Sequence, residues 1–357
     1  MDSTVLSGIR KNFTKELTDA QNGKKTSLPF IRHHLSLAPK VQKDEVFQVL
    51  RIGGSIYQNA LVQKVNGKIA VLKSSQKPLP VFTTKDVFLS FIDGALARDV
   101  THLALNFAYP MEPVNRNGYL DGKLIMGTKE HSFDGLTGSL VGSTIEQHIK
   151  DTHKRSVRVA LANDTVCLLL SGLNQFRWQG LVGGIIGTGL NFAIFLDEGT
   201  IVNLESANFD KFPQSAEGKL IDKASARPKS ALIEKEIAGG YLYQHFNLRL
   251  RKEGLHFPEV KSTKEMDAVA FGDIPMVSLL AREVSEHSSS LVSCQIAGIA
   301  DFLKRDCTVV IEGSLFWKGW RYKENVSITV RQLVPEYQVS FVFVEESGVL
   351  GAAKLLT

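Results

Sequence analysis

A chain of 357 residues with 43% apolar and 22% charged residues has the composition of a folded globular protein, which excludes a disordered chain and a short disulfide-stapled scaffold. Because a single hydrophobic core stops growing near about 250–300 residues, we expect two domains. The formal net charge of +5 is too small for this length to indicate nucleic-acid binding.

Cysteine usage favours a cytoplasmic protein. The chain has three cysteines, Cys167, Cys294 and Cys307, with no CxxC spacing. A disulfide framework or a zinc site needs more cysteines or other ligands at closer spacing. The first residues form no apolar signal segment, and no uninterrupted run of about 18 apolar residues predicts a membrane span.

The first half of the chain predicts a helix, then a strand meander, then alternating helices and strands. The turn signal Asn66-Gly67 joins two β-rich runs, which predicts an antiparallel hairpin. The predicted strands are 46–52, 55–65, 68–73, 102–109 and 157–161, and the predicted helices after the first 40 residues are 86–96 and 139–154.

The second half repeats this order. A strand at 181–187, a Gly-containing turn and a returning strand at 191–196 match the strand, Gly turn and strand of the first half. Long helical tracts are predicted at about 229–251 and 275–304, and strands at 307–312 and 337–344. Two similar α/β halves predict a duplicated fold with two lobes.

A series of short segments then carries a resemblance to the hexokinase family, in the sugar kinase, actin and Hsp70 superfamily. In chain order the segments are LPF (28–30), VLRIGGSIYQNALV (49–62), LALNFAYP (103–110), GTKEHSFDGLTG (127–138), LANDTV (161–166), IIGTGLNFAIF (185–195), NLESANFDKFP (203–213), ALIEKEIAGGYL (231–242), VSEHSSSL (284–291), IEGSLFWK (311–318) and EESGVLGAA (345–353). Their shared order implies an α/β, two-lobed actin-like ATPase (ribonuclease H-like) fold with a cleft between the lobes.

The resemblance also implies the extent of each lobe. Residues 41–170, completed by about 345–357, would form a small lobe that carries the first phosphate motif and the sugar loop. Residues 171–344 would form a large lobe with the second phosphate motif and the adenosine motif. Residues 1–40 would be an N-terminal helical segment that packs on the large lobe.

The function implied is that of an ATP-dependent hexose kinase of glycolysis, which transfers a phosphoryl group from MgATP to the 6-hydroxyl of a hexose such as glucose. The resemblance makes Asp164 the base that takes the hydroxyl proton, and ATP and Mg²⁺ the cofactors, with no protein metal ligand assigned. It assigns sugar binding to Thr128, Lys129, Asn163, Asn191, Glu205 and Glu234. It assigns nucleotide binding to Gly53, Gly54, Ser55, Gly187, Thr188, Gly189, Gly313 and Ser314. The expected partners are a hexose and a nucleotide, without nucleic acid or a transmembrane segment, and the oligomeric state stays open.

Each of these residues also has an ordinary structural interpretation. Asn163-Asp164 alone would be a strand-end turn or a helix cap, and Ser314 alone would be another cap. Single glutamates and lysines are mostly solvated surface residues, and each glycine pair alone would be a plain hairpin turn. Only the ordered series favours the functional interpretation.

Arg51 is the main departure from the family pattern. Hexokinases have an aspartate there that helps to hold the magnesium of MgATP. An arginine in its place changes the charge at this position from −1 to +1, a difference of two units. Unit charges about 5 Å apart interact by roughly 3 kcal/mol at an effective dielectric near 20, which makes this a large perturbation. Two hypotheses stay open: an active, divergent kinase in which Arg51 contacts phosphates, or a catalytically impaired sugar-binding sensor or regulatory protein.

One further pattern lies outside these motifs. Trp317 and Trp320 lie among Lys318, Arg321 and Lys323, a basic aromatic cluster. It could be a nucleic-acid or partner surface, but the pattern favours an exposed helix start after a strand.

Overall fold

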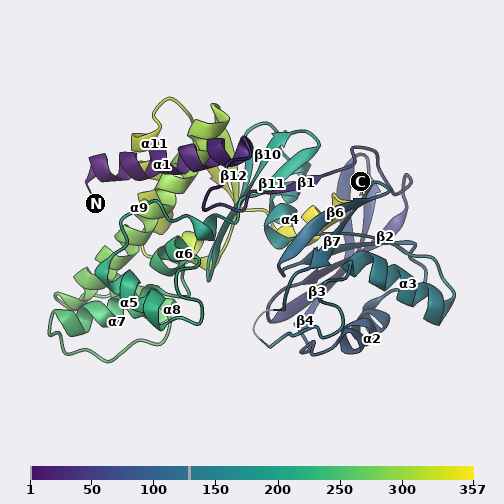
Figure 1. Ribbon diagram of the computed structural model, residues 1–357, viewed down its shortest axis with the longest axis horizontal. Coiled ribbons are helices and arrows are strands. Elements are labelled where there is room, and N and C mark those ends of the chain that lie inside the picture. Colours follow the sequence, from purple (N-terminus) through teal and green to yellow (C-terminus); the bar gives the residue numbers. More distant parts are fainter. Residues whose placement is uncertain (1, 128–129) are drawn as a thin grey trace. The chain divides into compact units, whose positions relative to one another are not determined.

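The computed structural model describes residues 2–127 and 130–357, and the chain divides into two compact units (Figure 1). Unit 1 contains Met1–Phe30, Gly184–Phe192 and Leu204–Phe343. Unit 2 contains Ile31–Gly183, Ala193–Asn203 and Val344–Thr357. The lobe boundaries expected from the sequence stay a prediction.

Unit 2 is built on a five-stranded sheet with the strand order β4-β3-β2-β5-β8. Its strands are β2 (Val46–Ile52), β3 (Ile56–Val65), β4 (Lys68–Pro78), β5 (His102–Phe107) and β8 (Arg158–Ala162). The first three form the predicted antiparallel meander, and Asn66 and Gly67 both adopt positive φ, as the hairpin turn requires. β2, β5 and β8 run parallel to one another, so their carboxyl ends meet at one edge of the sheet.

The helices of unit 2 confirm the predicted alternation. Its helices are α2 (Lys85–Ala95), α3 (Val141–His153), α4 (Asp164–Ser171), the 3₁₀ turn η1 (Gly172–Asn174) and α12 (Ser347–Ala353), and its remaining strands are β1 (Ile31–His34), β6 (Met111–Arg116), β7 (Tyr119–Leu124) and β11 (Thr200–Asn203). Buried aromatic rings dominate the core beneath the sheet, among them Phe82, Phe88, Phe107 and Phe133. The β6–β7 hairpin was not predicted.

Unit 1 consists mainly of helices. Its helices are α1 (Ser3–Gln21), the 3₁₀ turn η2 (Ser206–Asn208), α5 (Ala216–Ala224), α6 (Leu232–Ile237), α7 (Leu242–Lys252), α8 (Thr263–Phe271), α9 (Val277–Leu303), α10 (Ser314–Lys318) and α11 (Tyr322–Leu333). The predicted helical tract at 229–251 is in fact two helices, because the chain turns at Gly239 and Gly240. The predicted tract at 275–304 is the single long helix α9.

A second sheet has six strands in the order β1-β11-β10-β9-β12-β13. The strands not yet introduced are β9 (Leu181–Ile186), β10 (Leu190–Asp197), β12 (Cys307–Glu312) and β13 (Val339–Val342). Residues of β9 and β10 are divided between the two units. In unit 1, β12 and β13 pair in parallel.

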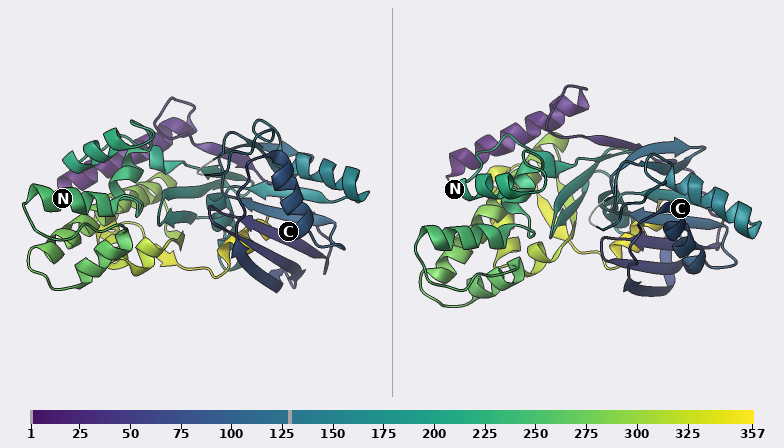
Figure 2. Two further views of the ribbon diagram at one scale, coloured as in Figure 1. Left: turned by 90° about the horizontal axis from the view of Figure 1, so that it is seen from below. Right: turned by 60° about the horizontal axis from the view of Figure 1, so that its bottom comes forward.

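Close packing joins α1 to α9 within unit 1, as the purple and light green helices in Figures 1 and 2 show. Gly298 permits this approach, because a Cβ atom there would lie 2.9 Å from the ring of Phe13. The Arg10 guanidinium pairs with Asp301 at 3.0 Å. In the described part of the chain, no helix combines the length and apolar character that crossing a membrane requires.

Candidate functional site

The predicted sugar-binding residues of unit 1 form one cluster. Asn191 lies in β10, and its Oδ1 accepts hydrogen bonds from the backbone N–H groups of Phe192 (2.8 Å) and Ser206 (3.2 Å). Its Nδ2 lies 3.5 Å from Glu205 Oε1. Glu205 adopts a left-handed conformation (φ 51°), which is uncommon for a residue with a side chain. The turn after β11 therefore aims the Glu205 carboxylate at the Asn191 amide.

Glu234 on α6 joins this cluster. Its Oε2 accepts a hydrogen bond from the backbone N–H of Leu190 at 3.0 Å. Burial raises the pKa of Glu234, and the negative charge of Glu205 raises it further. A Cβ atom at Gly189 would lie 3.0 Å from Glu234 Oε2, so glycine at this position permits the close approach. Two neighbouring carboxylates and an amide can accept from and donate to several hydroxyl groups at once.

The second predicted phosphate turn lies beside the predicted adenosine motif. Gly187 N–H donates to the carbonyl of Gly189 at 3.1 Å, which closes the turn. Gly313 has φ 132°, and a Cβ atom there would lie 2.1 Å from the carbonyl oxygen of Ile186. The structure thus brings the start of the turn, at Gly187, next to Gly313 and Ser314, and the glycines allow two backbone segments to touch.

The same turn is attached to the end of α6. Gly239 N–H donates to the carbonyl of Gly187 at 2.8 Å, and Gly240 N–H donates to the carbonyl of Thr188 at 3.0 Å. Since Glu234 is on α6, one short helix positions both the carboxylate that the sequence predicts to bind sugar and the Gly187–Gly189 turn.

Buried charged residues hold α6 in place. Lys235 Nζ donates to Asp222 Oδ1 and to the carbonyl of Arg227, both at 2.6 Å. Glu236 Oε1 accepts from His287 Nε2 at 2.9 Å and from the Ser215 N–H at 3.2 Å. Burial alone would raise the pKa of Glu236, but these hydrogen bonds outweigh it and leave the pKa below its usual value. The carboxylate therefore stays ionised in the interior, where an unpaired charge would be costly.

In unit 2, Asn163 and Asp164 lie where β8 ends and α4 begins. Asn163 caps the helix, because its Oδ1 accepts from the Thr165 N–H at 2.9 Å. Asp164 Oδ1 accepts from the same N–H at 2.8 Å. Asn203, at the end of β11, approaches Asn163 with 3.5 Å between Nδ2 and Oδ1, a neighbour that the sequence analysis did not single out. The cap explains the local fold and leaves the proposed chemical role of Asp164 open.

Arg51 lies at the same carboxyl edge of the sheet. It is aligned with Asn106 on β5, which is aligned in turn with Ala162, the residue before Asn163. A Cβ atom at Gly348 would lie 2.5 Å from Arg51 Cδ and 3.0 Å from Asn106 Nδ2, so the start of α12 packs directly on both side chains.

The pKa of the buried Cys167 thiol is affected by two charged residues at this edge of the sheet. Burial raises its pKa well above the usual value, the Asp164 carboxylate raises it further, and the Arg51 guanidinium lowers it. Both charged groups therefore act on the same buried thiol at the start of α4.

The remaining candidates are less informative. Gly53, Gly54 and Ser55 form the tight turn between β2 and β3, where the Gly53 N–H donates to the carbonyl of Ile56 at 3.1 Å. Gly54 and Ser55 are exposed. Thr128 and Lys129 lie outside the described residues. Within the described ranges, no group of three histidine, cysteine or acidic residues is arranged to hold a metal ion.

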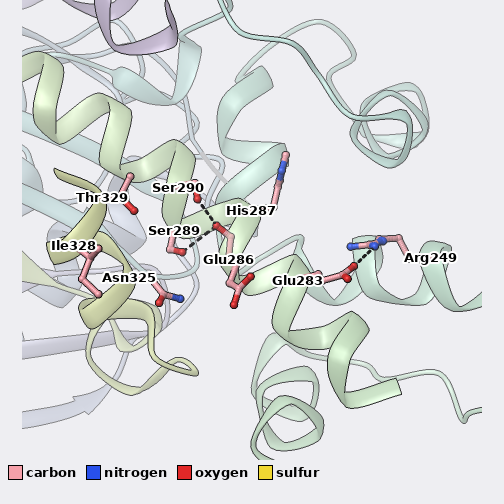
Figure 3. A pocket seen from close by; sticks show the side chains of 9 residues that line it. All are labelled: Arg249, Glu283, Glu286, His287, Ser289, Ser290, Asn325, Ile328 and Thr329. Atoms are coloured by element: carbon pink, nitrogen blue, oxygen red, sulfur yellow. Dashed lines mark hydrogen bonds and ion pairs between the residues drawn. The ribbon is translucent and has the colours of Figure 1, made fainter. Parts of the chain in front are cut away.

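A pocket of about 420 Å³ on unit 1 contains none of the predicted site residues (Figure 3). It is lined by side chains of α7, α9 and α11, and the ion pair between Arg249 and Glu283 crosses one side of it. Ser289 and Ser290 also line it, and both hydroxyl groups donate to the backbone carbonyl of Glu286. Their hydrogen bonds are thus satisfied within α9.

Comparison with known families identifies the chain. One family model described as hexokinase matches residues 1–173, and a second model with the same description matches residues 256–357. The chain is a divergent member of the hexokinase family. The two matches contain the Gly53-Gly54 turn, Asp164 and the Gly313-Ser314 turn, which the family resemblance had assigned to the site.

Known hexokinases resemble this divergent family member along most of its length. Human hexokinase-3 is 22% identical over 98% of this chain, hexokinase-7 of Oryza sativa subsp. japonica is 26% identical over 61%, and hexokinase-2 of Candida albicans is 26% identical over 72%. The chain spans only 45% of human hexokinase-3, 53% of the rice protein and 59% of the Candida protein. The chain thus spans about half the length of the curated relatives that it matches.

Solved hexokinase structures confirm the predicted fold class. The hexokinase from Schistosoma mansoni complexed with glucose has a TM-score of 0.80 at 20% identity. The match covers 100% of this chain and 95% of the Schistosoma chain. Another hexokinase crystal structure has a TM-score of 0.81 at 19% identity, with 100% and 97% coverage. The chain therefore has the α/β, two-lobed actin-like fold that the sequence predicted.

Proposed function

We propose that this hexokinase-family protein is an active hexose kinase that transfers a phosphoryl group from MgATP to the 6-hydroxyl of a hexose, with glucose as the first candidate. The observation that carries the proposal is the cluster of Asn191, Glu205 and Glu234 beside the Gly187–Gly189 turn. A kinase needs hydroxyl-binding groups next to backbone N–H groups that can approach phosphate closely.

The chemical roles follow from the residue types. Asp164 accepts the proton of the attacking hydroxyl, Asn163 helps to orient the sugar, and Asn191, Glu205 and Glu234 bind its other hydroxyl groups. Thr128 and Lys129 are proposed sugar contacts from the sequence alone. The Gly53, Gly54 and Ser55 turn and the Gly187, Thr188 and Gly189 turn approach the phosphates, while Gly313 and Ser314 contact the nucleoside.

Arg51 supports a second candidate, a sugar-binding sensor or regulator that transfers phosphate slowly or not at all. The aspartate that holds magnesium in hexokinases is absent at this position, and the arginine side chain packs on Gly348. In the favoured kinase, the Arg51 guanidinium contacts phosphate oxygens and compensates for the missing carboxylate.

We propose the cytoplasm as the location, because all three cysteines are free and buried. Glucose 6-phosphorylation there would supply glycolysis.

A coupled assay of ADP release with glucose, mannose and fructose separates the two candidates. The kinase predicts glucose-dependent turnover that falls by a factor on the order of 10² to 10⁴ in Asp164→Asn, because the variant lacks the base. Calorimetry provides the control, since the variant should still bind glucose. Glucose binding by the parent protein without turnover at high protein concentration and saturating MgATP would instead establish the sensor.

A further inference from the structure

The segment from Phe271 to Leu279 contains the last residue of α8, the connection 272–276 and the first residues of α9, and is here called the α8–α9 loop. It exposes an unusual number of large apolar side chains. Phe271 is 63% exposed, Ile274 44%, Met276 61% and Leu279 48%. Single exposed apolar residues are normal on a protein surface, but four within nine residues form a patch. Such a patch indicates a surface that is covered in use.

The loop is held firmly although its apolar side chains face solvent. Arg282 donates to the carbonyl of Ala270 at 2.9 Å and to the carbonyl of Gly272 at 2.7 Å. The buried hydroxyl of Ser278 accepts from the Ile274 N–H at 3.0 Å, and the Ser278 N–H donates to the Ile274 carbonyl at 2.8 Å. The patch is therefore a built surface with a fixed backbone.

The tip of the loop is also strained. Met276 has φ 63° and ψ −43°, and the Val277 N–H donates to the Pro275 carbonyl at 2.7 Å. This is the rare γ-turn with positive φ, which persists only where the surroundings enforce it and is concentrated at binding sites. The turn directs the Met276 side chain outward at the start of α9.

Basic and aromatic residues lie next to the loop. The Arg282 and Arg321 guanidinium groups lie 5.7 and 5.9 Å from the centre of the Trp320 ring. The Trp320 N–H approaches Asp267 Oδ1 on α8 at 3.4 Å. Lys318, Arg321 and Lys323 are exposed together within six residues, with Glu324 as the one exposed acid among them. Exposed acids on the adjoining segments are Glu265 on α8, Asp273, and Glu283 and Glu286 further along α9. Lys318, Arg321 and Lys323 are here called the basic rim. They belong to the basic aromatic cluster at 317–323 that the sequence shows.

We infer that the α8–α9 loop docks on the surface of an anionic lipid bilayer. The apolar side chains would enter the interfacial region, while the basic rim would contact lipid phosphates. A bilayer fits better than a peptide, because a surface that recognises a peptide receives apolar side chains in a groove, whereas the side chains of this segment are themselves exposed. The inference is independent of the kinase proposal.

Vesicle sedimentation tests this inference with the full chain. The probes are vesicles of phosphatidylcholine alone and vesicles of phosphatidylcholine mixed with phosphatidylserine. We expect at least tenfold tighter binding to the mixed vesicles, and at least tenfold weaker binding after the double substitution Ile274→Asp and Met276→Asp. Leu220→Asp on α5 is the matched control, because Leu220 is 55% exposed and remote in sequence from the loop. Its binding should equal that of the parent.

The charge contribution is tested separately by Lys318→Glu combined with Arg321→Glu, which should weaken binding to the mixed vesicles only. Circular dichroism establishes that each variant is folded. The inference is wrong if the parent fails to sediment with mixed vesicles, or if Leu220→Asp weakens binding as much as the loop variant. Sedimentation velocity adds another contradicting outcome: a dimer that the loop variant dissociates, without vesicle binding, would make the loop a contact between copies.

Discussion

Arg51 lies next to Asn106 on the neighbouring strand and against Gly348, at the carboxyl edge of the unit 2 sheet. A guanidinium group suits phosphate oxygens because it presents several N–H donors, which is the basis of the phosphate contact proposed for Arg51. The sequence revealed the charge reversal, but it could not show that glycine at 348 makes room for the longer side chain.

We predict that Arg51→Asp lowers the rate of ADP release. Hydrogen bonds to charged groups contribute about 1.5–3 kcal/mol, so the loss should be on the order of 10-fold to 100-fold. Arg51→Lys is the control, since it keeps the charge and should retain part of the activity. A higher rate in Arg51→Asp than in the parent would show that the arginine disables the site.

Asp267 gives a prediction about pH. Burial raises its pKa to about 6, while the Trp320 N–H partly opposes the shift. The folded protein therefore holds this proton more tightly than the unfolded chain, whose aspartates titrate near about 3.9. This contribution to stability is complete below the unfolded pKa and is lost as the pH rises through about 6.

Asp267→Asn should consequently be more stable than the parent at pH 8, by an amount on the order of 2 kcal/mol, and the difference should vanish near about pH 4. Denaturant unfolding at both pH values measures it. Asp273→Asn is the control, because Asp273 is exposed. Equal stability of parent and Asp267→Asn at pH 8 would contradict the assignment.

At the scale of elements, α6 connects the site to the interior of unit 1. The side chain of Lys235 is 4% exposed, and its ammonium is paired with Asp222. Burial raises the pKa of Asp222, yet the hydrogen bonds from Lys235 and from the Lys229 N–H outweigh it and keep the pKa below its usual value. Removing one partner of a buried ion pair leaves the other charge uncompensated.

Lys235→Met should therefore destabilise the protein by about 3 kcal/mol and weaken hexose binding, because Glu234 is the preceding residue on α6. Thermal unfolding and calorimetry with glucose measure the two effects. Lys219→Met serves for comparison, since Lys219 is exposed on α5. If folded Lys235→Met binds glucose with unchanged affinity, the proposed dependence of sugar binding on the position of α6 is wrong.

Two hairpins and one helix break show how much of the fold could be predicted from the sequence. Asn66-Gly67 marked a hairpin that the structure contains, because its geometry is set by two adjacent residues. Asn117-Gly118 carries the same signal between β6 and β7, so that hairpin could have been found as well. The adjacent glycines Gly239-Gly240 are a local signal for the break between α6 and α7, which the predicted tract at 229–251 overlooked. Their hydrogen bonds to the Gly187–Gly189 turn depend on tertiary packing, so the sequence could not show them.

Part of the candidate site could be predicted from the sequence, and part could not. The ordered motifs indicated Asn191, Glu205 and Glu234, and the structure brings these three together in unit 1. The supporting pairs, Lys235 with Asp222 and Glu236 with His287, were missed, because each joins residues from different helices. Pairs of this kind depend on tertiary packing, and a single sequence does not encode them in any spacing.

For the whole molecule, family membership and fold are shown by the two hexokinase models and by the TM-scores of 0.80 and 0.81. Neither establishes chemistry, since one fold hosts many functions. The proposed sugar-binding cluster in unit 1 and the proposed base in unit 2 therefore need a test on the intact chain.

The most direct measurement is ³¹P NMR of the protein incubated with MgATP and glucose. A hexose kinase should produce the resonance of glucose 6-phosphate together with ADP, and Asp164→Asn should form it on the order of 10² to 10⁴ times more slowly. Calorimetric glucose binding without any new phosphomonoester resonance would contradict the kinase and make the protein a sugar-binding member of its family.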